Sequence, residues 1–212
     1  MMIRRLLIAA LLSAPLAACQ TAQQPVATVD DDNWYVGSIP DQPHNIPLVD
    51  RRKMDPKYAR QTVEYKGPEK PGSIVVDIDE RMLYLVQPEG KAIRYGVGVG
   101  KQGFSWKGIA SVGRKGVWPN WSPTKTMVGI KPELPRYMEA GLDNPLGARA
   151  LYLHQNGADT LFRIHGTNEP WSIGEQVSSG CVRMLNEDVA DLYERVPVGT
   201  TVYVKRNGRY RV

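Results

Sequence analysis

The feature that most constrains this fold is a succession of short apolar runs that begins at Gly72. Residues 73–79 and 81–87 are β-rich and flank a short polar turn, which predicts a hairpin. A third run, residues 91–99, contains a glycine-rich section that indicates a bulge or a close backbone approach. Further strands are expected at residues 108–115, 150–154, 160–165 and 201–205.

Helical patterns are confined to two places in the same region. Residues 186–196 have apolar side chains at helical spacing behind Asn186, which we expect to be the N-cap. Residues 172–177 are expected to form only a turn or two of helix. The sequence therefore predicts a mainly β domain, a sandwich or mixed sheet with one principal helix.

A long connection without regular periodicity, residues 117–148, interrupts this pattern. A loop of that length in a compact domain is often a lid or a wall of a substrate site, so we expect it to lie over the functional site. The alternative is a packed surface excursion that is anchored by its two tryptophans, Trp118 and Trp121.

The first nineteen residues have the pattern of an export signal. Arg4 and Arg5 precede an apolar stretch, residues 6–18, that is too short to cross a bilayer as a helix. Leu16-Ala-Ala-Cys19 resembles a bacterial lipobox, in which the cysteine becomes a lipidated N-terminus, and Gln20 after it favours sorting to the outer membrane. An ordinary signal peptide that is cut near Ala18 is the alternative.

The stretch between this signal and Gly72 is rich in proline and lacks apolar periodicity, so we expect a tether that cannot fold alone. Part of it, residues 55–65, can lie along the domain, and His44 is expected to be a solvated linker residue. The predicted organisation is a signal peptide at 1–18, a lipidated tether at 19–71, a folded domain at 72–206 and a tail at 207–212.

Composition excludes several classes of protein. The 212 residues are 42% apolar and 23% charged, which is typical of a globular protein and not of a disordered chain, a collagen or a disulfide scaffold. The net charge of +5 is small and scattered, with no basic helix face, so we expect no nucleic-acid partner.

The two cysteines have different expected fates. Exported proteins occupy an oxidising compartment where thiols tend to pair. If Cys19 is lipidated, Cys181 has no partner, and an unpaired thiol there needs another explanation. His165 supplies one, because an imidazole close to a thiol can manage its proton and make it a nucleophile.

The residues around this pair suggest how it would work. The amides around Gly180 and Cys181 are candidates to bind a developing oxyanion, and Ser179 and Gly166 are further candidates to contact the oxyanion or the substrate. Arg183 is expected either to bind a substrate carboxylate or to fix the loop through an ion pair. Ser178, like Ser179, is expected to form a turn rather than act as a nucleophile. A metal site is disfavoured, because the chain has only three histidines and no paired ligand spacing.

The run from His165-Gly166 to Ser178-Ser-Gly-Cys181-Val-Arg-Met184 resembles the L,D-transpeptidase catalytic domain, the YkuD-like fold, in its ErfK/YbiS-type branch. The resemblance extends over residues 72–206. It includes, in order, Tyr95-Gly-Val-Gly-Val-Gly100, Trp118-Pro-Asn-Trp121, Asn144-Pro-Leu-Gly-Ala-Arg149 and Gly199-Thr-Thr-Val-Tyr-Val204.

This resemblance implies an enzyme in which Cys181 attacks the diaminopimelate carbonyl of a peptidoglycan tetrapeptide stem and expels D-alanine. His165 would be the proton donor and acceptor, and an acceptor amine would then resolve the thioester. One amide is exchanged for another, so no ATP, metal or organic cofactor is implied. The family is also characteristically acylated by carbapenems.

Two positions depart from the commonest pattern of the family. Ser179 replaces a second histidine, so any role of that histidine cannot be carried over. Gly166 replaces a serine found in some members, so only its backbone carbonyl can orient the imidazole. His154, on a neighbouring strand, is expected to be structural.

Two questions stay open at this level. The acyl acceptor can be another stem peptide, an amine of an outer-membrane protein, a free D-amino acid or water. The rival to an enzyme is a non-catalytic wall-binding lipoprotein, whereas a papain-like protease has the opposite order of cysteine and histidine.

Overall fold

The computed structural model describes residues 33–210 except 102–105 and 179. These residues lie within one compact unit that begins at Asp32. They form a nine-stranded mixed sheet, two small two-stranded sheets and two α-helices, so the mainly β class is confirmed. The strands of the main sheet are β3 (Gln61–Glu64), β4 (Ile74–Asp77), β5 (Met82–Gln87), β6 (Lys91–Gly96), β8 (Gly108–Val117), β9 (Arg149–Gln155), β10 (Ala158–His165), β12 (Val182–Arg183) and β13 (Thr201–Lys205).

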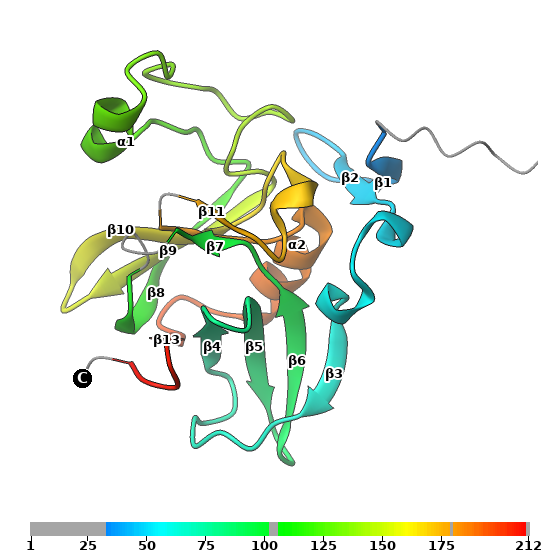
Figure 1. The fold of residues 1–212 in the computed structure, drawn as a ribbon, viewed down its shortest axis with the longest axis vertical. Helices are drawn as coiled ribbons and strands as arrows, with labels where there is room; N and C mark the ends of the chain where they lie inside the picture. The colour runs from blue at the N-terminus through cyan, green and yellow to red at the C-terminus, as the bar shows by residue number, and fades with distance from the viewer. Residues whose placement is uncertain (1–32, 102–105, 179, 211–212) are drawn as a thin grey trace, which may run out of the picture. The chain divides into compact units, whose positions relative to one another are not determined.

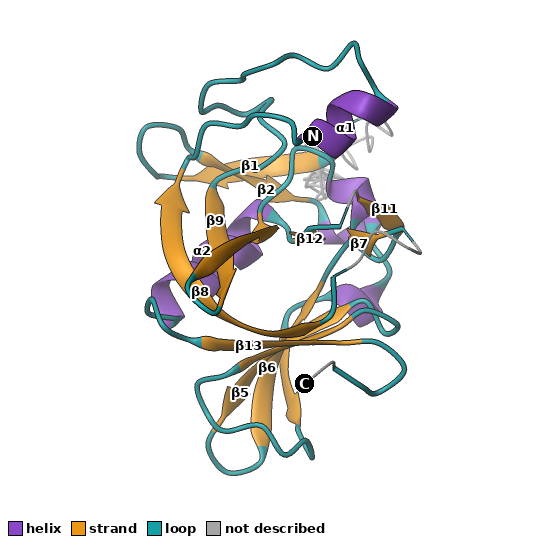
Figure 2. Ribbon diagram, turned by 90° about the vertical axis from the view of Figure 1, so that its left-hand side faces the viewer, coloured by secondary structure: helices purple, strands orange, loops and turns teal. Residues whose placement is uncertain are grey.

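The order across this sheet is β12-β10-β9-β8-β13-β4-β5-β6-β3. The predicted hairpin is confirmed, with Ile74 of β4 opposite Leu85 of β5. Most neighbours are antiparallel, but β13 runs parallel to β4 and β12 runs parallel to β10. The sheet is strongly curved (Figure 2), so its two halves can enclose a core between them.

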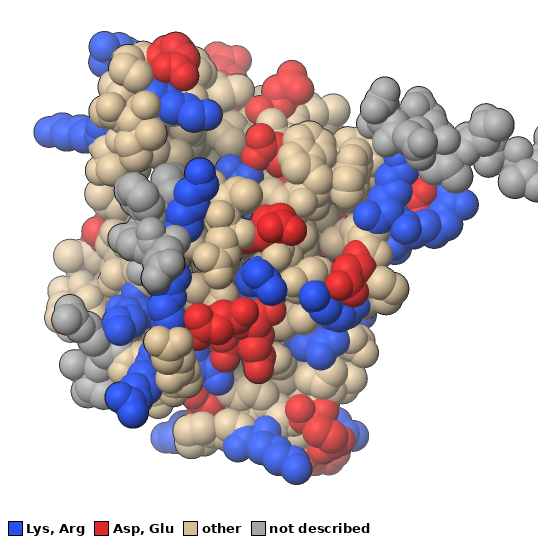
Figure 3. Space-filling view, in the orientation of Figure 1, with Lys and Arg blue, Asp and Glu red and all other residues tan. Residues whose placement is uncertain are grey.

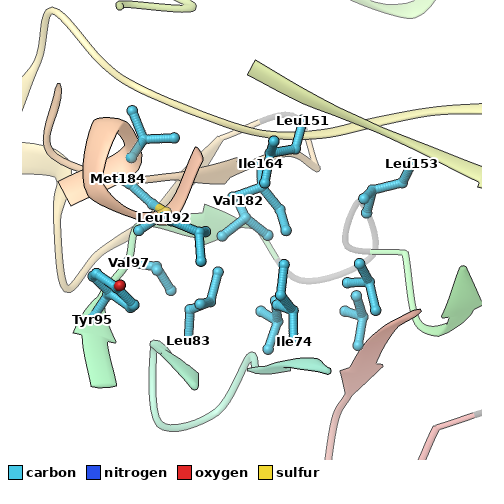
Figure 4. Packing of buried hydrophobic residues seen from close by; sticks show 14 of the residues in the cluster. Ile74, Leu83, Tyr95, Val97, Leu151, Leu153, Ile164, Val182, Met184 and Leu192 are labelled. Atoms are coloured by element: carbon cyan, nitrogen blue, oxygen red, sulfur yellow. The ribbon is translucent and has the colours of Figure 1, made fainter. Parts of the chain in front are cut away.

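The main core lies between these halves and the helix α2 (Asn186–Arg195). Leu151 and Ile164 from one half lie across from Ile74 and Leu83 of the other, and Leu192 of α2 packs beside them (Figure 4). All five side chains are buried. Burying each such side chain contributes about 1.5–3 kcal/mol, which makes this cluster a principal source of stability.

The helix α2 was predicted one residue longer and with a different cap. Leu185, not Asn186, is the N-cap residue, and it makes no side-chain capping bond. Asn186 is the first helical residue and its carboxamide is used elsewhere in the fold. The helical turn expected at 172–177 is also wrong, because a 3-10 turn (Pro170–Ser172) is followed there by the strand β11 (Gln176–Ser178).

The glycine-rich section after β6 makes the close backbone contact that was expected. A Cβ atom on Gly98 would lie 2.5 Å from the Ser172 carbonyl oxygen, which no side chain can tolerate. The following strand β7 (Val99–Gly100) pairs with β11, and Gly98 itself exchanges backbone hydrogen bonds with Arg183. This section therefore supports the segment that holds Cys181.

The predicted tether is wrong for residues 33–71. This part contains a hairpin of β1 (Tyr35–Ile39) and β2 (Ile46–Val49), two 3-10 turns at Arg51–Lys53 and Pro56–Tyr58, and the edge strand β3. The docking expected for residues 55–65 is confirmed, because β3 pairs with β6 along its whole length.

Polar contacts hold this N-terminal segment to the domain, which is why apolar periodicity did not reveal it. Arg51 forms ion pairs with Glu187 and Asp188 at the start of α2. Asp41 accepts hydrogen bonds from the Arg149 guanidinium at 2.7 and 2.8 Å and from the Trp118 indole at 2.8 Å. The environment expected for His44 is also wrong, because its ring is half-buried 5.1 Å from that of Trp118.

Residues 1–32, with the predicted signal peptide and Cys19, lie outside the described residues. Among the described ones, no helix is long and apolar enough to cross a membrane. Lysines and arginines are interspersed with acidic residues on the face seen in Figure 3, in keeping with the scattered charge of the sequence. The predicted tail folds back at least as far as Tyr210, whose ring lies 5.2 Å from that of Tyr203.

The long connection between β8 and β9 contains one element that the sequence did not predict, the short helix α1 (Lys125–Ile130). Figure 1 shows this connection on the same side of the sheet as β7 and β11. Trp118 and Trp121 are both buried at its start, as expected of anchors.

Candidate active site

Strand pairing brings the predicted histidine and cysteine to one face of the sheet. In the parallel pair of β10 and β12, Ile164 lies opposite Val182 and His165 lies opposite Arg183. Side chains alternate along a strand, and Ile164 and Val182 belong to the buried core. His165 and Arg183 therefore share the opposite face with Cys181, which comes two residues before Arg183.

That face opens into a cleft of about 570 Å³. His165, Ser178, Cys181 and Arg183 line it together, so the structure joins residues that the sequence had placed in one site. The connection between β8 and β9 supplies much of the facing wall, which confirms that it lies over the site. Its lining residues are Asn120, Trp121, Ser122, Thr124, Thr126, Met127, Pro145 and Leu146.

The His165 imidazole is buried and its tautomer is fixed. Its Nδ1 lies 2.6 Å from the Gly166 carbonyl oxygen, which can only accept a hydrogen bond. Nδ1 therefore carries the proton of the neutral ring, and Nε2 is the nitrogen left without one. Burial above all, and then the nearby Arg183 guanidinium, lowers the pKa of His165 to about 3, so the ring is neutral at ordinary pH.

The expectation that the Gly166 carbonyl orients the imidazole is thus confirmed. No larger residue fits at this position, because a Cβ on Gly166 would lie 2.1 Å from Oδ1 of Asn186. The Asn186 carboxamide accepts hydrogen bonds from the amides of Ala148 and Thr167 and donates one to the Thr167 carbonyl. The sequence did not identify Asn186 as a site residue, because its place at the start of a helix indicates a cap and not hydrogen bonds to distant segments.

The Cys181 thiol is half-buried and forms no disulfide. Its Sγ lies 4.0 Å from the Leu161 carbonyl oxygen. Burial raises the pKa of Cys181 against the opposing effect of Arg163. Burial therefore favours the neutral thiol, beside an imidazole that is neutral as well.

The turn before Cys181 is held by Ser178, which acts as the expected turn former. Its Oγ donates to the Cys181 carbonyl at 2.6 Å and accepts from the Gly180 amide at 3.2 Å. The Gly180 amide thus already has a partner within this turn. Ser179 lies outside the described residues.

Of the two roles expected for Arg183, the structure has the ion pair. Its Nη1 bonds to Oε2 of Glu169 and so fixes the segment after Cys181. His154 does not line the cleft, and its ring packs over Gly113 on β8 instead. The described residues include no group of three or more His, Cys, Asp or Glu side chains that is suited to hold a metal ion.

Comparison with known proteins places this site in a family. The YkuD model, described as the L,D-transpeptidase catalytic domain, matches residues 71–204. The probable L,D-transpeptidase ErfK/SrfK of Escherichia coli is 36% identical over 140 residues, which cover 62% of this chain and 43% of the relative. The probable L,D-transpeptidase YbiS of the same organism is 37% identical over 139 residues, with the same shares covered.

Two solved structures are also similar. A protein from Brucella melitensis, described as a probable carnitine operon oxidoreductase, is 49% identical, with 71% of this chain and 95% of that chain covered and a TM-score of 0.49. L,D-transpeptidase 3 from Mycobacterium tuberculosis is 17% identical, with 63% and 60% covered and a TM-score of 0.47. The chain spans less than half the length of the curated relatives named above. With the family model matched over most of its length, the chain belongs to the YkuD family of L,D-transpeptidase catalytic domains.

Proposed function

We propose that this chain is an L,D-transpeptidase that acts on peptidoglycan tetrapeptide stems through a thioester on Cys181. The observation that supports this most is His165, because its tautomer presents an unprotonated Nε2 in the same cleft as the free thiol. A protein that only bound the cell wall would need neither group.

In the first step, His165 Nε2 takes the thiol proton as Cys181 Sγ bonds to the diaminopimelate carbonyl carbon. The bond from that carbon to the D-alanine nitrogen then breaks, and the imidazolium gives its proton to the leaving amine. The carbonyls of Gly166 and Pro145 favour the charged imidazolium and so stabilise it while it exists. The Cys181 amide is the remaining candidate to bind the oxyanion.

In the second step, an acceptor amine attacks the thioester carbonyl and passes a proton to His165. The carbon–sulfur bond breaks and the sulfur recovers the proton. The acceptor is a stem-peptide amine, an amine of an outer-membrane protein, a free D-amino acid or water. Mass spectrometry of muropeptides from a deletion strain separates these acceptors, because loss of 3-3 cross-links and loss of protein-linked muropeptides are different signatures.

Covalent labelling tests the nucleophile. Protein without residues 1–19 should gain the mass of one carbapenem, located on Cys181. Cys181→Ala should give no adduct, and His165→Asn should slow the reaction by about 100-fold or more. His44→Asn is the matched control, because His44 contacts Trp118 and lies outside the cleft. Folded protein whose Cys181 stays unmodified after long exposure would contradict the proposal.

The second candidate function is a non-catalytic wall-binding lipoprotein, which the burial of Cys181 favours because it raises the pKa of the thiol and so disfavours the nucleophilic thiolate. This candidate predicts retention on peptidoglycan sacculi without an adduct, and equal retention by Cys181→Ala. The enzyme proposal predicts release of D-alanine from tetrapeptide stems by the same preparation.

We further propose that the protein works on the periplasmic side, anchored in the outer membrane through a lipid on Cys19. The lipobox-like Leu16-Ala-Ala-Cys19 and Gln20 support this. Metabolic labelling with a fatty acid should mark the wild type but not Cys19→Ala, and an unlabelled wild type would contradict the anchor.

A further inference from the structure

Three adjacent strands carry a stack of two arginines and a tyrosine on the wall of the cleft. The Arg114 guanidinium carbon lies 3.4 Å from the centre of the Tyr152 ring, and that of Arg163 lies 4.5 Å from it. Tyr152 on β9 is the register partner of Arg114 on β8 and of Arg163 on β10. All three residues line the cleft that contains Cys181.

Irregular registers on both sides create this arrangement. On β8, Val112 pairs with Leu153 and Arg114 pairs with Tyr152, so Gly113 is an extra residue. A Cβ on Gly113 would lie 2.2 Å from the His154 ring, so only glycine fits there. The register of β10 is also broken between Asp159 and Arg163. Bulges of this kind re-aim side chains beside functional sites.

The charges of the cleft are unevenly neutralised. Its lining includes Arg114, Arg163 and Arg183 but no aspartate or glutamate. Asp159 binds Arg163 with both oxygens, at 2.7 and 2.9 Å, and Glu169 pairs with Arg183. No described carboxylate lies within ion-pair distance of Arg114. Arg114 is therefore the arginine whose charge is available to a ligand.

We propose that Arg114, whose guanidinium lies over the Tyr152 ring, is a specificity-determining residue that binds a free carboxylate of the acyl donor. A guanidinium that stacks on a ring keeps its in-plane N–H groups free, and their spacing matches the two oxygens of a carboxylate. The Tyr152 ring limits the motion of Arg114, and Arg163 on the far strand closes the other side of this ring. This inference rests on the proposed function, because it names the recognition element of the same site.

Paired donor peptides test this role. A tetrapeptide stem is compared with two versions, one amidated at the terminal D-alanine and one amidated at the side-chain carboxylate of diaminopimelate. Amidation of the carboxylate that Arg114 binds should lower kcat/KM of the wild type by about tenfold, mainly through KM. In Arg114→Gln, the free and amidated donors should react at the same rate. The carboxylate that Arg114 binds is the one whose amidation slows the wild type but not Arg114→Gln.

Two matched variants separate this role from a structural one. Arg209→Gln, which changes an exposed arginine outside the cleft, should keep the discrimination of the wild type. Tyr152→Leu, which removes the stacking surface, should weaken it partly. Equal loss of activity toward all three donors in Arg114→Gln would overturn the inference. If no donor acylates Cys181 in the wild type, the proposed function fails instead.

Discussion

In the resting site, burial keeps the side chains of both His165 and Cys181 neutral. The neutral imidazole of His165 keeps its Nε2 ready to accept a proton, while the neutral Cys181 thiol is protected from the oxidising compartment that we propose for it. Charge separation would then occur only when a substrate carbonyl is present to be attacked. The His–Cys pair could be found from residue types and order, but this protonation state could not, since burial determines it.

The dependence of the free energy of unfolding on pH should show whether the His165 imidazole is neutral in the folded protein. The folded-state pKa of His165 is lowered from 6.5 to about 3, so between these values the unfolded chain binds a proton that the folded protein does not. The free energy of unfolding should therefore fall as the pH falls through this window, by up to about 1.4 kcal/mol per pH unit from this group.

Urea denaturation from pH 3.5 to 7 measures this effect. His165→Asn, which can still donate to the Gly166 carbonyl, should show a shallower dependence than the wild type, and His44→Asn should retain the wild-type slope. Equal slopes for the wild type and His165→Asn would show that the imidazole is not buried in its neutral form.

Among the elements, α2 links the parts of the site that come from distant segments. Its first residue, Asn186, ties the chain after His165 to the start of β9, and its acidic first turn receives Arg51 from the N-terminal segment. The sequence predicted most of the elements themselves, including β13 at residues 201–205, because their apolar patterns are local. It could not predict the contacts of Tyr152 with Arg114 and Arg163, because register shifts in β8 and β10 bring these residues together.

Removal of the Asn186 carboxamide should weaken both fold and activity. Asn186→Ala leaves two buried amides and one buried carbonyl without this partner, which should cost about 3 kcal/mol or more. We expect kcat to fall by about tenfold with little change in KM, because the Gly166 carbonyl would hold His165 less well.

The comparison for this variant is Asn168→Ala, which loses a single exposed hydrogen bond to the Asp143 carbonyl. It should cost less than about 1 kcal/mol in chemical denaturation and leave kcat unchanged. If both variants lose the same stability and activity, the Asn186 network has no special role.

At the scale of the whole molecule, the family domain and the folded unit have different boundaries. The family match begins at residue 71, near the boundary at 72 that periodicity predicts, yet β3 completes the sheet from outside that range. Tyr58 is buried in a core cluster with Met82 and Leu185. Residues 33–70 are held largely by ion pairs and by one edge strand, which leave no regular spacing of apolar residues in the sequence. The sequence therefore could not predict that this segment folds with the domain.

Truncation should reveal this dependence. A chain that begins at residue 71 loses Tyr58 and exposes the edge of β6, which is a template for aggregation. Its melting temperature should be at least 10 °C lower than that of a chain that begins at residue 33, since each kcal/mol lost lowers it by about 2–4 °C in a domain of this size. Equal melting temperatures and solubility of the two chains would show that residues 33–70 do not stabilise the domain.

The docked N-terminal segment also has a geometric consequence for the proposed anchor. Because folding takes up the chain from residue 33 onward, only residues 20–32 remain between Cys19 and the described domain. Thirteen residues span at most about 45 Å when fully extended. With a lipid on Cys19, residue 33 would stay within that distance of the membrane, so the depth of wall within reach would be set by this short link and by the width of the domain itself.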